Sequence, residues 1–139
     1  MALPAAKEAR LYYRAAKQRF DDAQLLLEYG RTTGAVYLAG YTAECFLKAL
    51  VLARIPAKIR GKVFVGFRGH WAHNVVLIYE ELYLKKGGTA MPKGVRLHFW
   101  RLAQWSTDLR YETRMLKKRE ADDFMASVVE FAKWADGRL

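Results

Sequence analysis

The sequence predicts an all-α fold, an antiparallel helical bundle of about five helices that forms a single domain over residues 1–139. Two segments, 7–29 and 118–136, carry apolar residues at the spacing of an amphipathic helix. A third segment, 34–53, is apolar almost all round, as expected of a helix enclosed by others. The chain of 139 residues contains no convincing linker, and its length suits one domain.

The three long helices differ in how much of their surface is apolar. The face of 7–29 consists of Tyr13, Ala16, Phe20, Ala23 and Leu27, and that of 118–136 of Ala121, Phe124, Val128, Phe131 and Ala135. Gly30 is expected to end the first helix, because glycine is favoured just after a helix C-terminus. In 34–53 the polar side chains share one stripe: Tyr37, Tyr41, Glu44 and Lys48.

The middle of the chain has weaker patterns. We expect an irregular segment over 54–70, with glycines around a short β-like run, Lys-Val-Phe-Val-Gly-Phe. Two further helices are predicted at 71–85 and 92–106, and a bend at 107–117.

Segment 34–53 is long enough to cross a membrane, but charge is expensive in lipid, and Glu44 and Lys48 lie within it. Their spacing of four residues suits an ion pair inside a protein, so we expect no membrane association. A single cysteine, Cys45, and a charged N-terminal region without a signal-peptide pattern lead us to expect a cytoplasmic protein.

Positive charge is concentrated in the middle of the chain. The net charge is +10, and residues 54–119 hold 15 Lys and Arg against 4 Asp and Glu. Such a face favours a polyanionic partner, RNA or another nucleic acid first and anionic lipid second. The alternative is a solvated surface that only aids solubility.

Several enzyme classes lack their motifs here. The sequence has no Gly-rich phosphate loop with lysine, no Gly-x-Ser-x-Gly and no Cys-x-x-Cys. His70 and His73 are three residues apart but have no acidic neighbour in sequence to complete a metal site. We therefore predict neither a metal nor a cofactor.

The segment Arg68-Gly-His70-Trp-Ala-His73 carries the candidate catalytic residues Arg68, His73 and His70. Cleavage of RNA without a metal needs a base for the ribose 2′-OH, a proton donor for the leaving oxygen and a cation for the phosphate. Histidine and arginine supply these roles, and a helix N-terminus at 71 would attract phosphate. In the alternative interpretation, a histidine caps the helix and Arg68 is solvated.

Two further groups are candidate RNA- or nucleotide-binding residues. Phe64, Phe67 and Trp71 are interleaved with Lys58, Arg60, Lys62 and Arg68, so these aromatic rings either stack on bases or hold the segment to the bundle. Arg110 and Tyr111 lie between Asp108 and Glu112. For this cluster we favour a structural role, in which buried hydrogen bonds join bundle ends, over a phosphate contact.

The sequence resembles the HEPN domain family of prokaryotic toxin and nucleotide-related systems. Glu44-Cys-Phe-Leu-Lys48-Ala resembles the family's Glu-x3-Lys-Ala segment, His73-Asn-Val-Val-Leu its His-Asp-Leu segment, and Trp105 to Tyr111 its Arg-Tyr element. The resemblance implies a helical bundle that is often homodimeric and, in many members, a metal-independent RNase with an Arg-x4–6-His motif. Arg68 and His73 fit that spacing, although in active members the motif commonly lies nearer the last helices.

Two functions follow as hypotheses. The first is a toxin-type endoribonuclease that uses Arg68, His73 and His70. The second is a non-catalytic RNA- or nucleotide-binding protein that partners a nucleotidyltransferase or another defence-system subunit. In the second case Tyr37, Tyr41 and Glu44 would line a groove between helices, and Glu44 and Lys48 are candidate RNA- or nucleotide-binding residues. The residues favour the first slightly, and a basic face that serves only solubility is a third alternative.

Overall fold

The computed structural model describes residues 3–139, apart from the side chain of His70. These residues form helices and no strand, so the all-α prediction is confirmed. The α-helices are α1 (Lys7–Glu28), α2 (Thr32–Arg54), α3 (Ala57–Gly66), α4 (Val75–Leu77), α5 (Lys93–Leu102) and α6 (Lys118–Asp136). Two 3₁₀ helices, η1 (His70–His73) and η3 (Thr107–Tyr111), and a π-helix, η2 (Ile78–Leu84), complete the fold.

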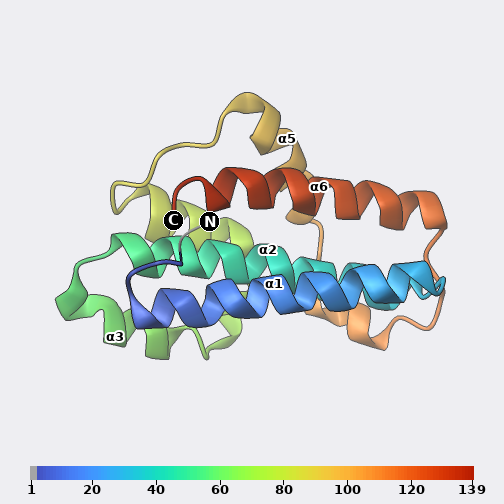
Figure 1. Cartoon of the computed structure of the whole chain (residues 1–139), viewed down its shortest axis with the longest axis horizontal. Coiled ribbons are helices and arrows are strands. Elements are labelled where there is room, and N and C mark those ends of the chain that lie inside the picture. Colours follow the sequence, from blue (N-terminus) through green and yellow to red (C-terminus); the bar gives the residue numbers. More distant parts are fainter. Residues whose placement is uncertain (1–2) are drawn as a thin grey trace.

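Helices α1 and α2 form an antiparallel pair along the length of the molecule (Figure 1). The turn between them depends on Gly30, whose φ of +73° lies in the left-handed region that glycine adopts without strain. The buried face of α1 is mostly small, with Ala9, Ala16 and Ala23 fully buried, so that α2 can approach closely.

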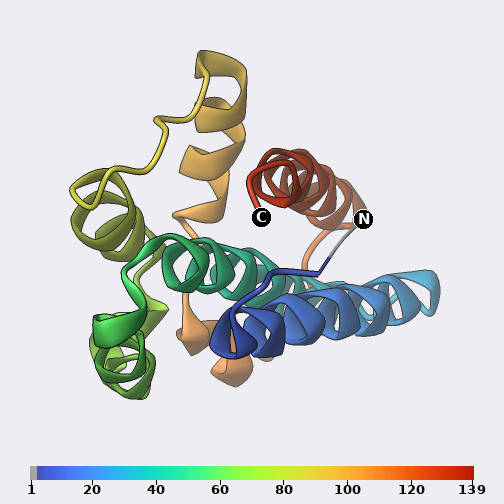
Figure 2. The same cartoon turned by 60° about the vertical axis from the view of Figure 1, so that its left-hand side comes forward.

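Helix α2 is the centre of the bundle, and α6 packs along it in the same direction (Figure 1). The hydroxyl of Thr33, near the start of α2, donates to the carbonyl of Arg114 at 2.8 Å and accepts from the amide of Leu116 at 2.9 Å. These bonds place the starts of α2 and α6 at one end of the molecule. Helix α5 lies beside α6 (Figure 2), where the rings of Phe99 and Phe131 stack with centroids 5.8 Å apart.

Within the described residues, one helix is long and apolar enough to cross a membrane, and that helix is α2. In the bundle, 78% of its apolar window is buried by the other helices. This burial fits the core helix of a soluble domain.

The prediction of an irregular segment with a β-like run over 54–70 was wrong, because most of it forms α3. The rings of Phe64 and Phe67 pack edge-on against Tyr12 of α1 at 5.9 and 5.8 Å, and this packing overrides the local β propensity. Arg60 reaches back and donates to the carbonyls of Leu52 and Ile55 at 2.8 and 3.2 Å, which caps the end of α2.

The predicted helix over 71–85 is divided into three parts. Asn74 is extended between η1 and α4, and its side-chain oxygen accepts from the amide of Leu77 at 3.1 Å. It therefore caps the second part, and no continuous helix begins at 71. The third part is the π-helix η2, which follows α4 directly. The bend before α6 and the bounds of α6 agree with the prediction, whereas α5 ends at Leu102.

Candidate functional site

The site is built on the polar stripe of α2, which the sequence had indicated. Glu44 and Lys48, one helical turn apart, are both 3% exposed. Nζ of Lys48 donates to Oε2 of Glu44 at 2.8 Å. Burial of either charge alone would cost several kcal/mol, so each side chain requires the other.

His73 connects this buried pair to the surface. Its Nδ1 lies 2.9 Å from Oε1 of Glu44, while 43% of its side chain is exposed. A carboxylate only accepts hydrogen bonds, so the proton of the neutral imidazole is on Nδ1. The lone pair is consequently on Nε2, which is the arrangement required of a proton acceptor.

The ammonium of Lys48 is also enclosed by aromatic rings. Nζ lies 5.4 Å from the ring centroid of Tyr12 and 5.3 Å from that of Phe67, at cation–π distance. The expectation that Glu44 and Lys48 contact RNA directly is therefore corrected: both are enclosed and already paired. The pair contacts His73 through Oε1 of Glu44.

Tyr41 and Trp105 cover the next turn of the stripe. The Trp105 ring lies 4.9 Å from Tyr41 between centroids, and the Tyr41 ring lies 6.0 Å from His73. Burial, followed by the 3.2 Å hydrogen bond to the Tyr37 hydroxyl, raises the pKa of Tyr41 above its usual value. Tyr41 is therefore a neutral phenol that packs beside the imidazole. The sequence had not marked Trp105 as part of the site, although its position before Arg110 was a signal.

An open cleft of about 260 Å³ lies against His73, and we call it the His73 cleft. It is lined by His73, Asn74, Val75, Ala103, Trp105, Ser106 and Thr107. Amide and hydroxyl groups beside an imidazole suit a polar ligand that carries hydrogen-bond acceptors.

The predicted cations of the middle segment divide into two groups. Lys58 and Lys62 are exposed and four residues apart on α3, so they share a face of that helix. The guanidinium of Arg60 donates to carbonyls at the end of α2, so Arg60 contributes to the fold, and its assignment to RNA stays a prediction. Trp71 is 42% exposed and lies against Phe67, 6.0 Å between centroids.

The candidate catalytic residues are only partly brought together. Arg68 is exposed just beyond α3, and its charge reaches Tyr12, where it opposes the burial that raises the pKa of that phenol. Among the described side chains, no hydrogen bond or ion pair joins Arg68 to His73. The prediction for His70 falls on a side chain outside the described ones.

The interpretation of Arg110 as a buried structural residue was wrong. Arg110 and Tyr111 are exposed, and the guanidinium lies over the Tyr111 ring, 4.9 Å from its centroid. Tyr111 and, to a smaller extent, Tyr37 raise the pKa of Arg110 above its usual value. Within residues 3–139 no ion pair links it to Asp108 or Glu112, and all three side chains are exposed.

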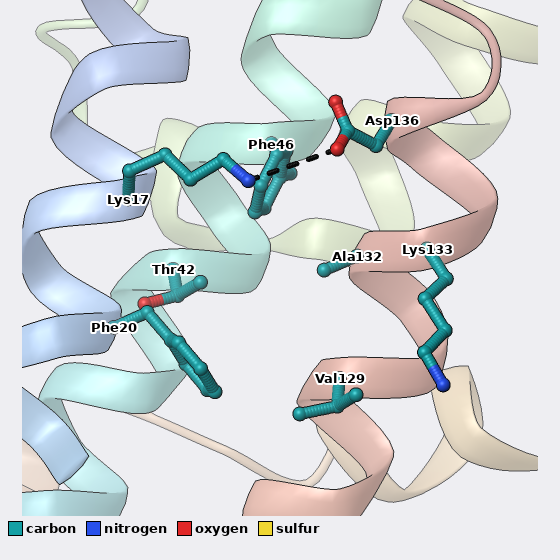
Figure 3. Close-up of a pocket in the computed structure, with 8 residues that line it drawn as sticks. All are labelled: Lys17, Phe20, Thr42, Phe46, Val129, Ala132, Lys133 and Asp136. Carbon is teal, nitrogen blue, oxygen red and sulfur yellow. Dashed lines mark ion pairs between the residues drawn. The ribbon is translucent and has the colours of Figure 1, made fainter. Parts of the chain in front are cut away.

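A separate small cleft of about 160 Å³ lies between α1, α2 and α6 (Figure 3). Lys17 of α1 reaches across it to Asp136 of α6, with Nζ 3.7 Å from Oδ2. Phe20, Phe46, Val129 and Ala132 form its apolar walls. An internal ion pair over apolar walls serves to join α1 to α6, and we assign no chemistry to it.

Over residues 3–139, apart from the side chain of His70, no three His, Cys, Asp or Glu side chains gather closely enough to hold a metal ion.

The fold and site define a class of protein, a small helical bundle whose central helix carries a buried Glu–Lys pair bonded to a surface histidine. The family model of the HEPN domain matches residues 9–138, and the chain therefore belongs to the HEPN family. No curated protein and no solved structure gives a significant match to the chain.

Proposed function

We propose that this HEPN protein is a metal-independent endoribonuclease in which His73 is the proton acceptor. The observation that carries the proposal is the 2.9 Å contact between Nδ1 of His73 and the buried carboxylate of Glu44. This contact fixes the ring and its tautomer, and it leaves Nε2 free for a substrate in the His73 cleft. An oriented imidazole next to an open cleft is the arrangement that general-base catalysis requires.

In the proposed reaction, Nε2 of His73 takes the proton of a ribose 2′-hydroxyl. The 2′-oxygen then bonds to the adjacent phosphorus, and the bond from phosphorus to the 5′-oxygen breaks. The products carry a 2′,3′-cyclic phosphate and a 5′-hydroxyl. We assign charge stabilisation at the phosphorus to Arg68 and the proton for the leaving oxygen to His70, as the sequence motif proposes.

The surface charge supports an RNA substrate. The exposed cations Lys58, Lys62 and Arg68 follow one another along α3 and its end, and the exposed Trp71 offers a ring for stacking. Attraction of this kind weakens as salt rises, because counterions leave the phosphates on binding.

The test is cleavage of single-stranded RNA by purified protein in EDTA. We expect products with 2′,3′-cyclic phosphate ends, and a fall of about 100-fold or more in rate for His73→Ala, the usual contribution of a general base. His98→Ala is the matched control, since His98 of α5 bonds to Ser127 of α6 and lies outside the His73 cleft. Equal rates for wild type and His73→Ala, or no cleavage by either, would remove the assignment.

A second function is favoured by one observation, the burial of Glu44 and Lys48. Because the pair is buried, Oε1 of Glu44 needs a hydrogen-bond donor, and His73 supplies it. His73 would then have a structural role. The protein would then bind RNA or a nucleotide without cutting it, as a partner of a nucleotidyltransferase or another defence-system subunit. Salt-sensitive RNA binding without cleavage, together with copurification of such a partner, would support this alternative.

Assembly is part of both proposals. We propose a homodimer, as is frequent in this family, in which a second copy brings its own cationic face to the RNA. Sedimentation at several protein concentrations tests the dimer without reference to activity.

A further inference from the structure

A second cleft, of about 430 Å³, lies at the start of α2, and we call it the arginine cleft. Three of its lining residues are arginines from different parts of the chain: Arg31 before α2, Arg110 in η3 and Arg114 before α6. Tyr37, Leu26, Leu109 and Met115 supply aromatic and apolar walls. The His73 cleft shares none of these residues.

The charges of the arginine cleft are unbalanced. Glu112 is the one acidic residue among those that line it, and its Oε1 accepts a hydrogen bond from the backbone amide of Arg114 at 2.8 Å. Within residues 3–139, none of the three arginine side chains takes part in an ion pair. Like charges around one cavity repel each other, and a bound anion removes that repulsion.

The backbone at the start of α2 adds to this field. No side chain caps the helix, because the hydroxyls of Thr32 and Thr33 bond instead to the chain at Leu116 and Arg114. The first turn of this 23-residue helix thus has amide groups without a side-chain cap, and its residues Thr33 and Gly34 line the cleft that arginines make positive.

The apolar side of the cleft indicates what accompanies the anion. Tyr37 lies between the arginines and Tyr41, with the two tyrosine rings 5.2 Å apart. An aromatic ring beside leucine and methionine side chains suits a planar base, whereas guanidinium groups suit phosphate oxygens.

We infer that the arginine cleft is a phosphate-binding site for a nucleotide, either free or as part of an RNA strand. Thr33, which lines the arginine cleft, and Glu44, which contacts His73, are eleven residues apart on α2, about 16 Å at helical rise. No residue lines both clefts, so we assign them to different phosphates. The inference does not rest on catalysis by His73, and it adds Arg31 and Arg114 to the residues that bind the ligand.

The test is calorimetric titration of the full chain with inorganic phosphate, adenosine, adenosine 5′-monophosphate and a short single-stranded RNA. Wild-type protein should bind the monophosphate more tightly than adenosine. Arg31→Ala and Arg114→Ala should each weaken binding of the monophosphate by about tenfold, the loss expected for one charged hydrogen bond. The matched control is Arg96→Ala, an exposed arginine of α5 outside the cleft, which should bind as wild type does.

The ligand series separates the two sources of phosphate. Tight binding of RNA with weak binding of the monophosphate identifies the strand as the ligand, and the reverse identifies a free nucleotide. In either case Arg31→Ala and Arg114→Ala must weaken binding of the preferred ligand. Arg114→Lys, which keeps the positive charge, should bind more tightly than Arg114→Ala. Equal affinities in wild type and both alanine variants, or failure of the wild type to bind any phosphate-bearing ligand, would overturn the inference. Neither result depends on cleavage, which His73→Ala tests separately.

Discussion

Nδ1 of His73 lies 2.9 Å from Oε1 of Glu44, although 29 positions separate the two residues in the chain. Through this contact a half-exposed imidazole is attached to a carboxylate that the bundle encloses. The other oxygen of Glu44 accepts from Lys48, so the three side chains form one network that runs from the core to the surface. Both the stability of α2 and the proposed chemistry depend on it.

Removal of the Glu44 carboxylate is expected to destabilise the protein strongly. Glu44→Ala leaves Lys48 buried without its anionic partner, and breaking a buried pair in this way costs about 3–5 kcal/mol. Urea denaturation followed by circular dichroism measures the loss. The double replacement of Glu44 and Lys48 by methionine should be far less destabilising, because no charge remains buried. A single variant as stable as wild type would contradict this account.

Removal of the His73 imidazole is expected to destabilise the protein only slightly. His73→Ala leaves the Glu44–Lys48 pair in place and opens Oε1 to water through a side chain that is already 43% exposed. The expected loss is about 1 kcal/mol, that of one hydrogen bond. The same urea titration separates a catalytic loss from unfolding. A loss as large as that of Glu44→Ala would mean that His73 acts mainly in folding.

The long helices could be predicted because their signals are local. The periodic apolar residues of α1 and α6 and the glycine at position 30 fix these elements within the sequence itself. The stripe on α2 was also visible, since Tyr37, Tyr41, Glu44 and Lys48 follow helical spacing. The all-α class followed from these patterns, whereas the HEPN family followed from the resemblance of the segments around Glu44, His73 and Arg110 to that family.

The errors concern residues whose state depends on distant partners. Helix α3 is held by contacts of Phe64 and Phe67 with Tyr12, more than fifty positions earlier, and no local pattern shows that contact. In the sequence, Arg60 and Lys58 are both basic residues of the same segment and cannot be told apart. In the structure, Arg60 donates to the carbonyl of Leu52 and so caps the end of α2. Arg110 lies in the short 3₁₀ helix η3, and no local pattern in the sequence shows that its side chain is exposed there.

Close packing of Trp105 makes one glycine essential. A Cβ on Gly40 would lie 2.1 Å from the indole of Trp105, a distance that requires the ring to move. Gly40→Ala should therefore destabilise the protein by about 1–3 kcal/mol, the usual cost of overpacking. Gly61→Ala is the matched control, because Gly61 lies within α3 and a Cβ there meets nothing within 4 Å. That change should stabilise the helix by about 0.5–1 kcal/mol. Thermal melts of the two variants should shift in opposite directions, and shifts of the same sign would contradict the packing.

Asn74, which lines the His73 cleft, gives a fourth stability test. Its side-chain oxygen accepts from the amide of Leu77 at 3.1 Å and caps α4. Asn74→Ala should cost about 1 kcal/mol, whereas Asn74→Asp keeps the acceptor and adds a favourable charge at the helix start. Urea midpoints should rank Asp at or above Asn, and both above Ala. An alanine variant equal to wild type would show that the cap does not contribute.

The last prediction concerns the thiol of Cys45. Burial, and to a smaller extent the charge of Glu44, raises the pKa of Cys45 to about 12 from an ordinary value of 9.0. Because the thiolate is the reactive form, the folded protein at pH 8 should react with a thiol reagent such as DTNB far more slowly than the unfolded chain. The unfolded state releases the thiol proton at lower pH than the folded state, so this group lowers the free energy of unfolding as pH rises above about 9. Between pH 8 and pH 10, the free energy of unfolding should fall less for Cys45→Ala than for wild type. Urea titrations at the two pH values would measure this difference. Rapid labelling of the folded protein at pH 8 would contradict the enclosed position of Cys45 beside the Glu44–Lys48 pair.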